Sequence, residues 1–215
     1  MGGSTARFHV YFGGTFDPPH NGHEVILRAL VNDAWVAKVH VVPTGRNPLK
    51  SSSQAPWSNN RARRELVEAW LASFPQDRVQ LETLELDQSD ATAQYTVDTL
   101  EQLRARDGGE WTLCVGGDIP RDFAKWKNIE ILLAKLHSLW VVPRGDQPDP
   151  FIEMPVELQA LVERRMLAVQ APAVSSTELR ALLGDTTRNE AERLQALTQA
   201  PIPESVRAWL RRAGS

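Results

Sequence analysis

Short apolar runs alternate along this chain with segments of helical periodicity, and this alternation is what most limits the fold. The apolar runs predict strands at residues 8–12, 38–42, 79–86, 111–115, 138–142 and 166–169. The helical segments predict helices at residues 23–35, 59–74, 96–106, 128–136, 176–183 and 203–212. Such a pattern is typical of an α/β fold, a doubly wound parallel sheet with helices on both faces. Ligands of such sheets bind beyond the carboxyl ends of the strands, so the residues that follow each strand are the first functional candidates.

The length and composition set the broad class of the protein. Its 215 residues fit one domain, 1–215, with residues 172–215 as a C-terminal helical part. The net charge of −3 offers no basic field for nucleic acid or anionic lipid. The one cysteine, Cys114, lies in an apolar run, is expected to be buried and excludes a disulfide framework. With no apolar run of membrane-spanning length and no signal-peptide pattern in residues 1–7, we expect a cytoplasmic protein, and a homo-oligomer is left open.

The turn after the first predicted strand is rich in glycine and histidine. Residues 13–23 read Gly-Gly-Thr-Phe-Asp-Pro-Pro-His-Asn-Gly-His and lead into a helix. Glycines let backbone N–H groups approach an anion, a helix start adds partial positive charge, and the imidazoles of His20 and His23 can donate to phosphate. The alternative is an ordinary turn with two surface histidines. A glycine pair alone would favour that alternative, but the whole pattern favours a phosphate site.

A second candidate phosphate site opens the helix predicted near the end of the chain. Ser175, Ser176 and Thr177 supply hydroxyls, and Arg180 follows one turn later. Hydroxyls, helix N–H groups and a guanidinium fork all bind phosphate oxygens, although a well-capped helix would have the same sequence. The pairing with residues 13–23 favours the functional interpretation, because both segments are helix starts that follow strands.

Further candidates follow other predicted strands. Gly116 would permit close approach of a ribose or base, and Asp118 could accept hydrogen bonds. Trp126 could be core, the common fate of tryptophan, but its polar neighbours favour the wall of a ligand site. Residues 43–57 hold prolines, serines and the basic Arg46 and Lys50, which predicts a mobile loop. Lys50 could close over phosphates, whereas a solvated loop is the simpler interpretation of Arg46.

Together these segments resemble the nucleotidylyltransferase superfamily. Its signature is a glycine-rich turn ending in His-x-Gly-His, plus a Ser-Ser/Thr-x-x-Arg helix start near the C-terminus, here at residues 13–23 and 176–180. Within the superfamily the chain is most similar to bacterial nicotinate-nucleotide adenylyltransferases, over residues 8–210. That similarity rests on residues 13–18, on Tyr-Thr-Val-Asp-Thr-Leu at 95–100, on Gly117-Asp118 with Trp126, and on Pro-Glu-Ser-Val at 203–206.

The resemblance implies a Rossmann-like fold and transfer of AMP from ATP to nicotinate mononucleotide, giving deamido-NAD and pyrophosphate in NAD biosynthesis. The 5′-phosphate of the mononucleotide would attack the α-phosphorus of ATP in line, so catalysis would be positioning and charge stabilisation. Mg²⁺ would arrive with ATP, and no protein-held metal is expected. The catalytic residues implied are His20, His23, Lys50 and Arg180. The ATP-binding residues implied are Gly13, Gly14, Thr15, Phe16, His20, His23, Gly116, Asp118, Ser175, Ser176, Thr177 and Arg180. The mononucleotide-binding residues implied are Lys50, Tyr95, Thr96, Asp118 and Trp126.

One loop departs from the family pattern and leaves alternatives open. Thr44 and Leu49 stand where the family usually has asparagine and histidine. Nicotinamide mononucleotide therefore remains an alternative acceptor. A second alternative activity is that of a phosphopantetheine adenylyltransferase, and the segment with Asp118 and Trp126 argues against it. The third alternative is a nucleotide-binding sensor of the same fold that has no catalytic activity. The presence of His20, His23 and Arg180 argues against it, because a sensor needs no contacts to a transition state.

Overall fold

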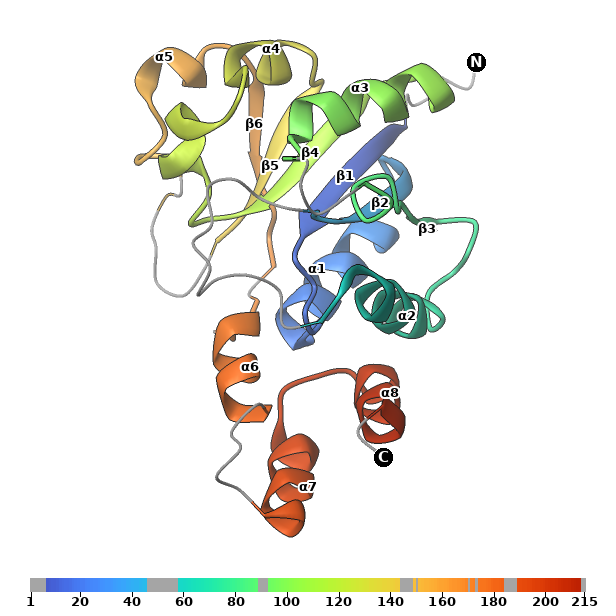
Figure 1. Cartoon of the computed structure of the whole chain (residues 1–215). Helices are drawn as coiled ribbons and strands as arrows, with labels where there is room; N and C mark the ends of the chain where they lie inside the picture. Colours follow the sequence, from blue (N-terminus) through green and yellow to red (C-terminus); the bar gives the residue numbers. More distant parts are fainter. Residues whose placement is uncertain are drawn as a thin grey trace.

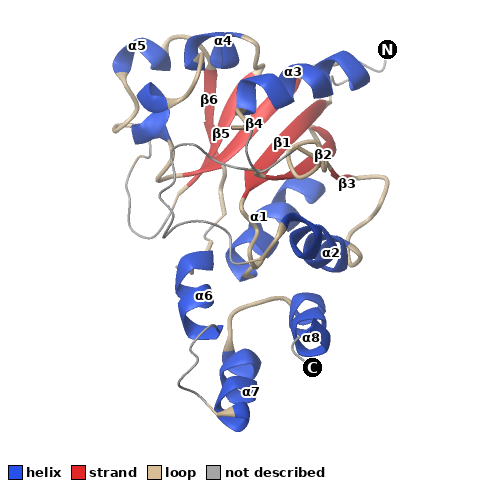
Figure 2. Cartoon of the chain, viewed as in Figure 1, coloured by secondary structure: helices blue, strands red, loops and turns tan. Residues whose placement is uncertain are grey.

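The computed structural model of the chain describes residues 7–45, 58–88, 93–143, 149, 151–169, 171–172, 174–183 and 189–213. Its centre is a six-stranded sheet with strand order β3-β2-β1-β4-β5-β6 (Figure 2). The strands are β1 (Phe8–Gly14), β2 (Val36–Pro43), β3 (Val79–Leu81), β4 (Trp111–Gly116), β5 (Ser138–Val142) and β6 (Glu163–Met166). All five strand pairings are parallel. The order reverses between β1 and β4, so the prediction of a doubly wound, Rossmann-like sheet is confirmed.

Helices cover both faces of this sheet (Figure 1). One face carries α1 (Asn21–Asn32) and α2 (Asn60–Leu71), and the other carries α3 (Thr96–Asp107) and α4 (Ile129–Ala134). A 3₁₀ helix, η2 (Pro120–Lys125), precedes α4, and the short α5 (Val156–Gln159) precedes β6. The chain ends in α6 (Ser176–Leu183), α7 (Glu190–Gln199) and α8 (Glu204–Ala213). Of these, α8 packs against α2, which joins the C-terminal helices to the sheet layer.

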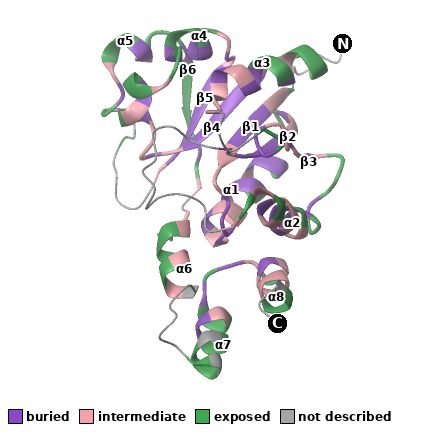
Figure 3. Ribbon diagram, viewed as in Figure 1, coloured by how far each residue is buried: buried purple, intermediate pink, exposed green. Residues whose placement is uncertain are grey.

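The hydrophobic core has two parts, one on each side of the sheet. In α1 the buried residues Ile26, Leu27, Leu30 and Val31 form one stripe at helical spacing. They pack with Trp70 of α2 in the part that also includes residues of the C-terminal helices. The second part lies under α3 and α4. In Figure 3 the central strands are buried and the edge strand β6 is exposed.

Two strands differ from the sequence prediction. The third was expected over 79–86, but β3 ends at Leu81, and after a last ladder bond from Glu82 N–H to Val41 O at 2.9 Å the chain enters a turn at residues 84–86. The last was expected over 166–169, but β6 is Glu163–Met166. All four of its residues are exposed, so an edge strand of this kind carries no apolar run to mark it.

The helix ends also differ in part from the prediction. The second helix was expected from residue 59, but Asn59 is the N-cap of α2 and accepts from Ala62 N–H at 2.9 Å. Tyr95 is the N-cap residue of α3, so Thr96 is its first helical residue. Gly108 ends α3 with φ of 66°, a left-handed value that glycine adopts without strain. Helices η2, α5 and α7 were not predicted from the sequence. Among the described residues, no helix is both long enough and apolar enough to cross a membrane.

Candidate active site

The histidine turn forms the start of α1, directly after β1. His20 is the N-cap residue, and its N–H donates to His23 Nδ1 at 3.2 Å. In return, His23 N–H donates to His20 Nδ1 at 3.4 Å. The two rings stack with centroids 3.7 Å apart. This is a capping box in which two imidazoles take the places of the usual hydroxyl and carboxylate. His20 is buried and His23 is half-buried, so the pair sits at a partly shielded helix start.

These backbone bonds fix the proton positions on both rings. A backbone N–H can only donate, so each Nδ1 must offer a lone pair. In the neutral imidazole the proton is then on Nε2 of both His20 and His23. Gly22 makes the ring pair possible, because a Cβ there would lie 2.9 Å from His20 Nδ1. The turn therefore holds two Nε2–H donors at the positive end of a helix, an arrangement suited to phosphate oxygens.

The second predicted phosphate motif docks onto the first. Ser176 Oγ donates to Pro18 O at 3.0 Å, and Arg180 Nη1 donates to Asp17 O at 2.9 Å. Arg180 Nη2 also donates to Thr177 Oγ1 at 3.0 Å. The start of α6 is capped by Ser175, whose Oγ accepts from Glu178 N–H at 3.2 Å. The two segments, about 160 residues apart in sequence, thus lie side by side beyond the carboxyl ends of the central strands.

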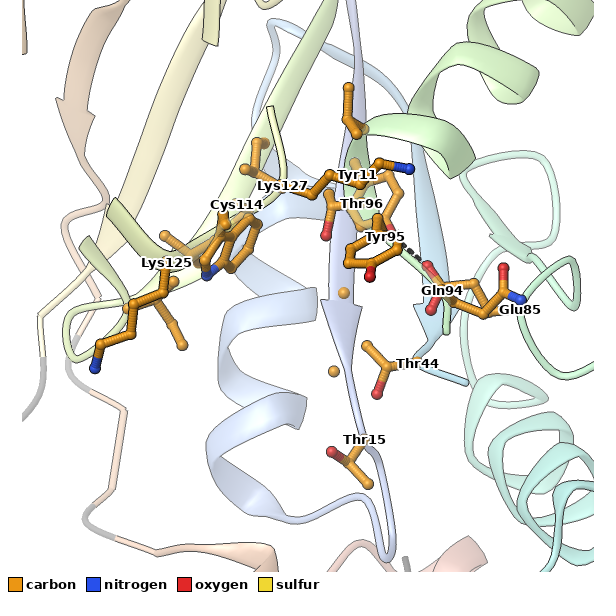
Figure 4. A pocket seen from close by; sticks show the side chains of 17 residues that line it. Tyr11, Thr15, Thr44, Glu85, Gln94, Tyr95, Thr96, Cys114, Lys125 and Lys127 are labelled. Carbon is orange, nitrogen blue, oxygen red and sulfur yellow. Dashed lines mark hydrogen bonds between the residues drawn. The ribbon is translucent and has the colours of Figure 1, made fainter. Parts of the chain in front are cut away.

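A cavity of about 180 Å³ opens at the same edge of the sheet (Figure 4). It lies where the sheet order reverses, between the ends of β1 and β4. Its lining includes six of the residues predicted for ligand binding, namely Gly13, Gly14, Thr15, Tyr95, Thr96 and Trp126. Thr44, Glu85, Lys125 and Lys127 also line it, and none of these was predicted. The turn predicted to bind phosphate and the predicted pyridine site therefore border one space.

A buried carboxylate closes one side of this cavity. Glu85 Oε1 accepts from Tyr11 Oη and Thr99 Oγ1, each at 2.9 Å, and its Oε2 accepts from Gly45 N–H at 3.0 Å. Gly45 has no room for a side chain, since a Cβ would lie 2.6 Å from the Glu85 carbonyl oxygen. Burial and the neighbouring Glu85 raise the pKa of Tyr11 well above its ordinary value, so its hydroxyl stays a donor. Glu85 thereby joins β1, α3 and the end of β2 around the cavity.

Two lysines, Lys125 and Lys127, lie on another side of the cavity, next to the predicted pyridine wall, and each is paired with an aspartate. The Lys127 ammonium lies 4.4 Å from the centroid of the Tyr95 ring and 3.0 Å from Asp98 Oδ2. Trp126 is half-buried and meets Phe123 edge-on, with centroids 5.2 Å apart. The described cavity can thus accept an aromatic ring between aromatic walls, with a cation near its rim.

The thiol at the base of the cavity is not suited to nucleophilic chemistry. Burial raises the pKa of Cys114 to about 12, so the thiolate is scarce at neutral pH. The expectation that Cys114 is buried is confirmed.

Some predicted residues lie elsewhere. Gly116, the last residue of β4, and the half-buried Asp118 lie at the same sheet edge but are outside the cavity lining. Phe16 is fully buried at the turn, where its ring meets His23 at 4.8 Å, so it supports the histidine. Arg46 and Lys50, with most of the loop predicted at 43–57, lie outside the described residues. Among the residues that were missed, Glu85 carries a signal in sequence, a carboxylate between two leucines.

Comparisons with known proteins identify the family of the chain and relatives that share its fold. The cytidylyltransferase-like family model matches residues 11–182. A protein of Leptospira interrogans named probable nicotinate-nucleotide adenylyltransferase is 31% identical over 79% of this chain and 81% of its own length. One of the same name from Marinobacter nauticus is 31% identical over 94% of both chains. The structure of Plasmodium falciparum nicotinic acid mononucleotide adenylyltransferase complexed with NaAD shares the fold, with a TM-score of 0.69 and 17% identity over 96% of both chains.

Proposed function

The chain belongs to the cytidylyltransferase-like family, and from this premise we propose that it is a nicotinate-nucleotide adenylyltransferase of NAD biosynthesis. It transfers AMP from ATP to nicotinate mononucleotide and releases pyrophosphate. The observation that carries the proposal is the docking of the Ser176–Arg180 segment on the His20–His23 turn beside one aromatic-walled cavity. A transferase of this kind needs such an arrangement, because a triphosphate and a pyridine nucleotide must meet in line.

In the proposed mechanism the protein positions two substrates and stabilises charge. The 5′-phosphate of the mononucleotide attacks the α-phosphorus of ATP, and pyrophosphate leaves on the opposite side. The Nε2–H groups of His20 and His23 are assigned to the α- and β-phosphates, where negative charge grows in the transition state. Arg180 is assigned to the triphosphate with Lys50, and the hydroxyls of Ser175, Ser176 and Thr177 to its oxygens.

The nucleotide partners follow from the same assignment. ATP enters as its Mg²⁺ complex, so the cation is part of the substrate and keeps most of its waters. The His20–His23 turn suits that complex, because it presents N–H donors to phosphate oxygens. We propose the turn residues 13–16 together with Gly116 and Asp118 as the remaining ATP contacts. The compartment proposed for this reaction is the cytoplasm, since Cys114 is a free thiol.

The pyridine ring is assigned to the cavity between Tyr95, Thr96 and Trp126. The start of α3 at Thr96 offers backbone N–H groups that have no partner inside the helix. Lys127 adds positive charge at the rim. A nicotinate carboxylate gains from both, whereas a neutral amide gains less. These features favour the acid form of the substrate, despite Thr44 and Leu49 in the loop.

Pyrophosphate release tests this function directly. Purified protein with MgATP should release pyrophosphate rapidly with nicotinate mononucleotide, more slowly with nicotinamide mononucleotide and not with 4′-phosphopantetheine. Equal kcat/KM for the two pyridine nucleotides would contradict the acid preference. Release with phosphopantetheine alone would identify the other transferase. ATP binding without release for any acceptor would identify a nucleotide-binding protein with no catalytic activity.

A further inference from the structure

A second pair of histidines lies between the sheet and the end of α3. His9 of β1 faces His40 of β2, with His9 Nδ1 2.9 Å from His40 Nε2. His40 is fully buried and His9 is half-buried. Both rings lie against Trp111, with centroids 4.9 and 4.6 Å from the indole. Neither histidine lines the cavity of the candidate active site, so the proposed reaction gives them no role.

The orientation of His40 is set by a carboxylate behind it. His40 Nδ1 lies 2.8 Å from Glu82 Oε1. Burial alone would raise the pKa of Glu82, but hydrogen bonds from Arg106 and His40 outweigh it and lower that pKa. An ionised carboxylate only accepts, so Nδ1 of His40 carries a proton and its Nε2 turns a lone pair toward His9. A carboxylate behind a histidine in this way is the usual partner of a metal-binding imidazole.

A third candidate ligand comes from the last residue of α3. One ligand atom each from His9, His40 and Asp107 lies within 4.8 Å of the other two, and Asp107 Oδ2 lies 3.9 Å from His40 Nδ1. Arg106 holds Asp107 at 2.7 Å and Glu82 at 2.6 Å, which fixes both carboxylates. Each carboxylate oxygen has a second lone pair for another partner. The cations that oppose metal binding here are Arg106 and Lys38, and the Lys38 ammonium lies 3.4 Å from Gln80 Oε1.

We propose that His9, His40 and Asp107 bind a divalent transition-metal cation of the zinc class, with Glu82 orienting His40. Two imidazoles and one carboxylate form a ligand set that suits zinc, and water would complete a tetrahedron. Two nitrogens bound to zinc lie about 3.3 Å apart, given Zn–N bonds of about 2.0–2.1 Å. His9 Nδ1 and His40 Nε2 are 2.9 Å apart and thus need to separate by only a few tenths of an ångström, a movement that the half-buried His9 can make. The cation would link β1 and β2 to the end of α3, whose first turn lines the cavity.

Zinc titration of the full-length protein tests the site. Protein without an affinity tag is treated with EDTA, dialysed and titrated with Zn²⁺ at pH 7.5 by calorimetry, and its bound metal is counted by mass spectrometry. The site binds one Zn²⁺ per chain and raises Tm. The variants His9→Gln and Asp107→Asn keep the fold, because neither side chain is fully buried. Each weakens Zn²⁺ binding more than about tenfold, because even the loss of a residue that only hydrogen-bonds to a metal ligand generally costs about that much.

Two controls separate this cluster from the other histidines. His137→Gln removes a histidine near the same end of the sheet that faces Glu110, and it leaves Zn²⁺ affinity unchanged. His23→Ala breaks the second close imidazole pair and also retains the site. Absence of Zn²⁺ binding in the wild-type protein would overturn the proposal. So would an unchanged affinity in both His9→Gln and Asp107→Asn, with Tm values in EDTA showing that the variants are folded.

Discussion

At the scale of single residues, the Nε2–H group of His23 is the donor proposed to stabilise charge on the phosphates. The capping box leaves that proton on Nε2, aimed away from the helix backbone. Replacing His23 by alanine removes this donor from the growing charge on the phosphates, so kcat should fall by about 10²–10³ with a smaller change in the KM for ATP. Steady-state pyrophosphate release measures both constants. His137→Ala is the matched control, and near-normal kcat in His23→Ala would remove the residue from the mechanism.

The substitution Trp126→Ala tests where the pyridine ring binds. The indole is half-buried and lines the cavity, so its truncation should raise the KM for the mononucleotide and leave the KM for ATP little changed. Stacking on an electron-poor ring contributes beyond area burial. Removal of a core tryptophan costs about 3–5 kcal/mol, and a lining tryptophan should cost much less. A large loss of Tm with an unchanged KM for the mononucleotide would show that Trp126 serves the core.

Between elements, Glu85 joins β1, α3 and the end of β2, and Glu85→Gln tests that role. All three of its contacts are donors, from Tyr11, Thr99 and Gly45. The amide of glutamine would point its own NH₂ at one of them, which should cost about 1–3 kcal/mol of stability. Displacement of the cavity side that Glu85 closes should also raise the KM for the mononucleotide. Urea unfolding and kinetics measure the two effects, with the exposed Glu68→Gln as control. Wild-type stability in Glu85→Gln would mean that this network contributes little.

The same elements show what sequence can and cannot predict. Strands β1, β2, β4 and β5 carry apolar runs because they are buried on both faces, and the glycines at the ends of β1 and β4 indicate the edge of the sheet where we propose that phosphate binds. The edge strand β6 lacks that signal, so its start was misplaced by three residues. The contacts of Glu85 with Tyr11 and Gly45 join residues far apart in sequence. Local patterns carry no information on such pairs, so the network was not predicted.

Across the whole molecule, described residues of the C-terminal helices share the core of the sheet, and we propose that they unfold together with it as one domain. Ile202 and Val206 are buried in the same cluster as Trp70 and Leu27. Ile202→Ala should therefore cost about 2–5 kcal/mol and lower Tm for the entire chain in one transition. Leu194→Ala, at a 54% exposed site on α7, is the control. Two transitions, with only the smaller one shifted, would indicate that residues 172–215 unfold as a separate unit.

The stability of the whole molecule should also depend on pH through the cluster at the end of α3. Burial and the neighbouring His40 lower the pKa of His9, and hydrogen bonding to Arg106 lowers the pKa of Asp107. The pKa of Glu82 is lowered as well. All three groups therefore bind protons more readily in the unfolded chain, and stability must fall as pH falls. The loss through His9 begins near its unfolded pKa of about 6.5, and the loss through the two carboxylates begins near about 4.

The prediction is a two-stage decline in the free energy of unfolding, measured by urea at pH values from 8 to 3.5 in EDTA. His9→Gln has no proton to gain, so it should flatten the curve between pH 6.5 and 5 while keeping the decline below it. Asp107→Asn should flatten the acid part and leave the upper part in place. His137→Gln should follow the wild-type curve, because its imidazole lies outside the cluster. If the free energy of unfolding of His9→Gln instead falls as steeply as that of the wild type between pH 6.5 and 5, another group accounts for that decline. Protonation of His9 would then contribute nothing to stability in this range.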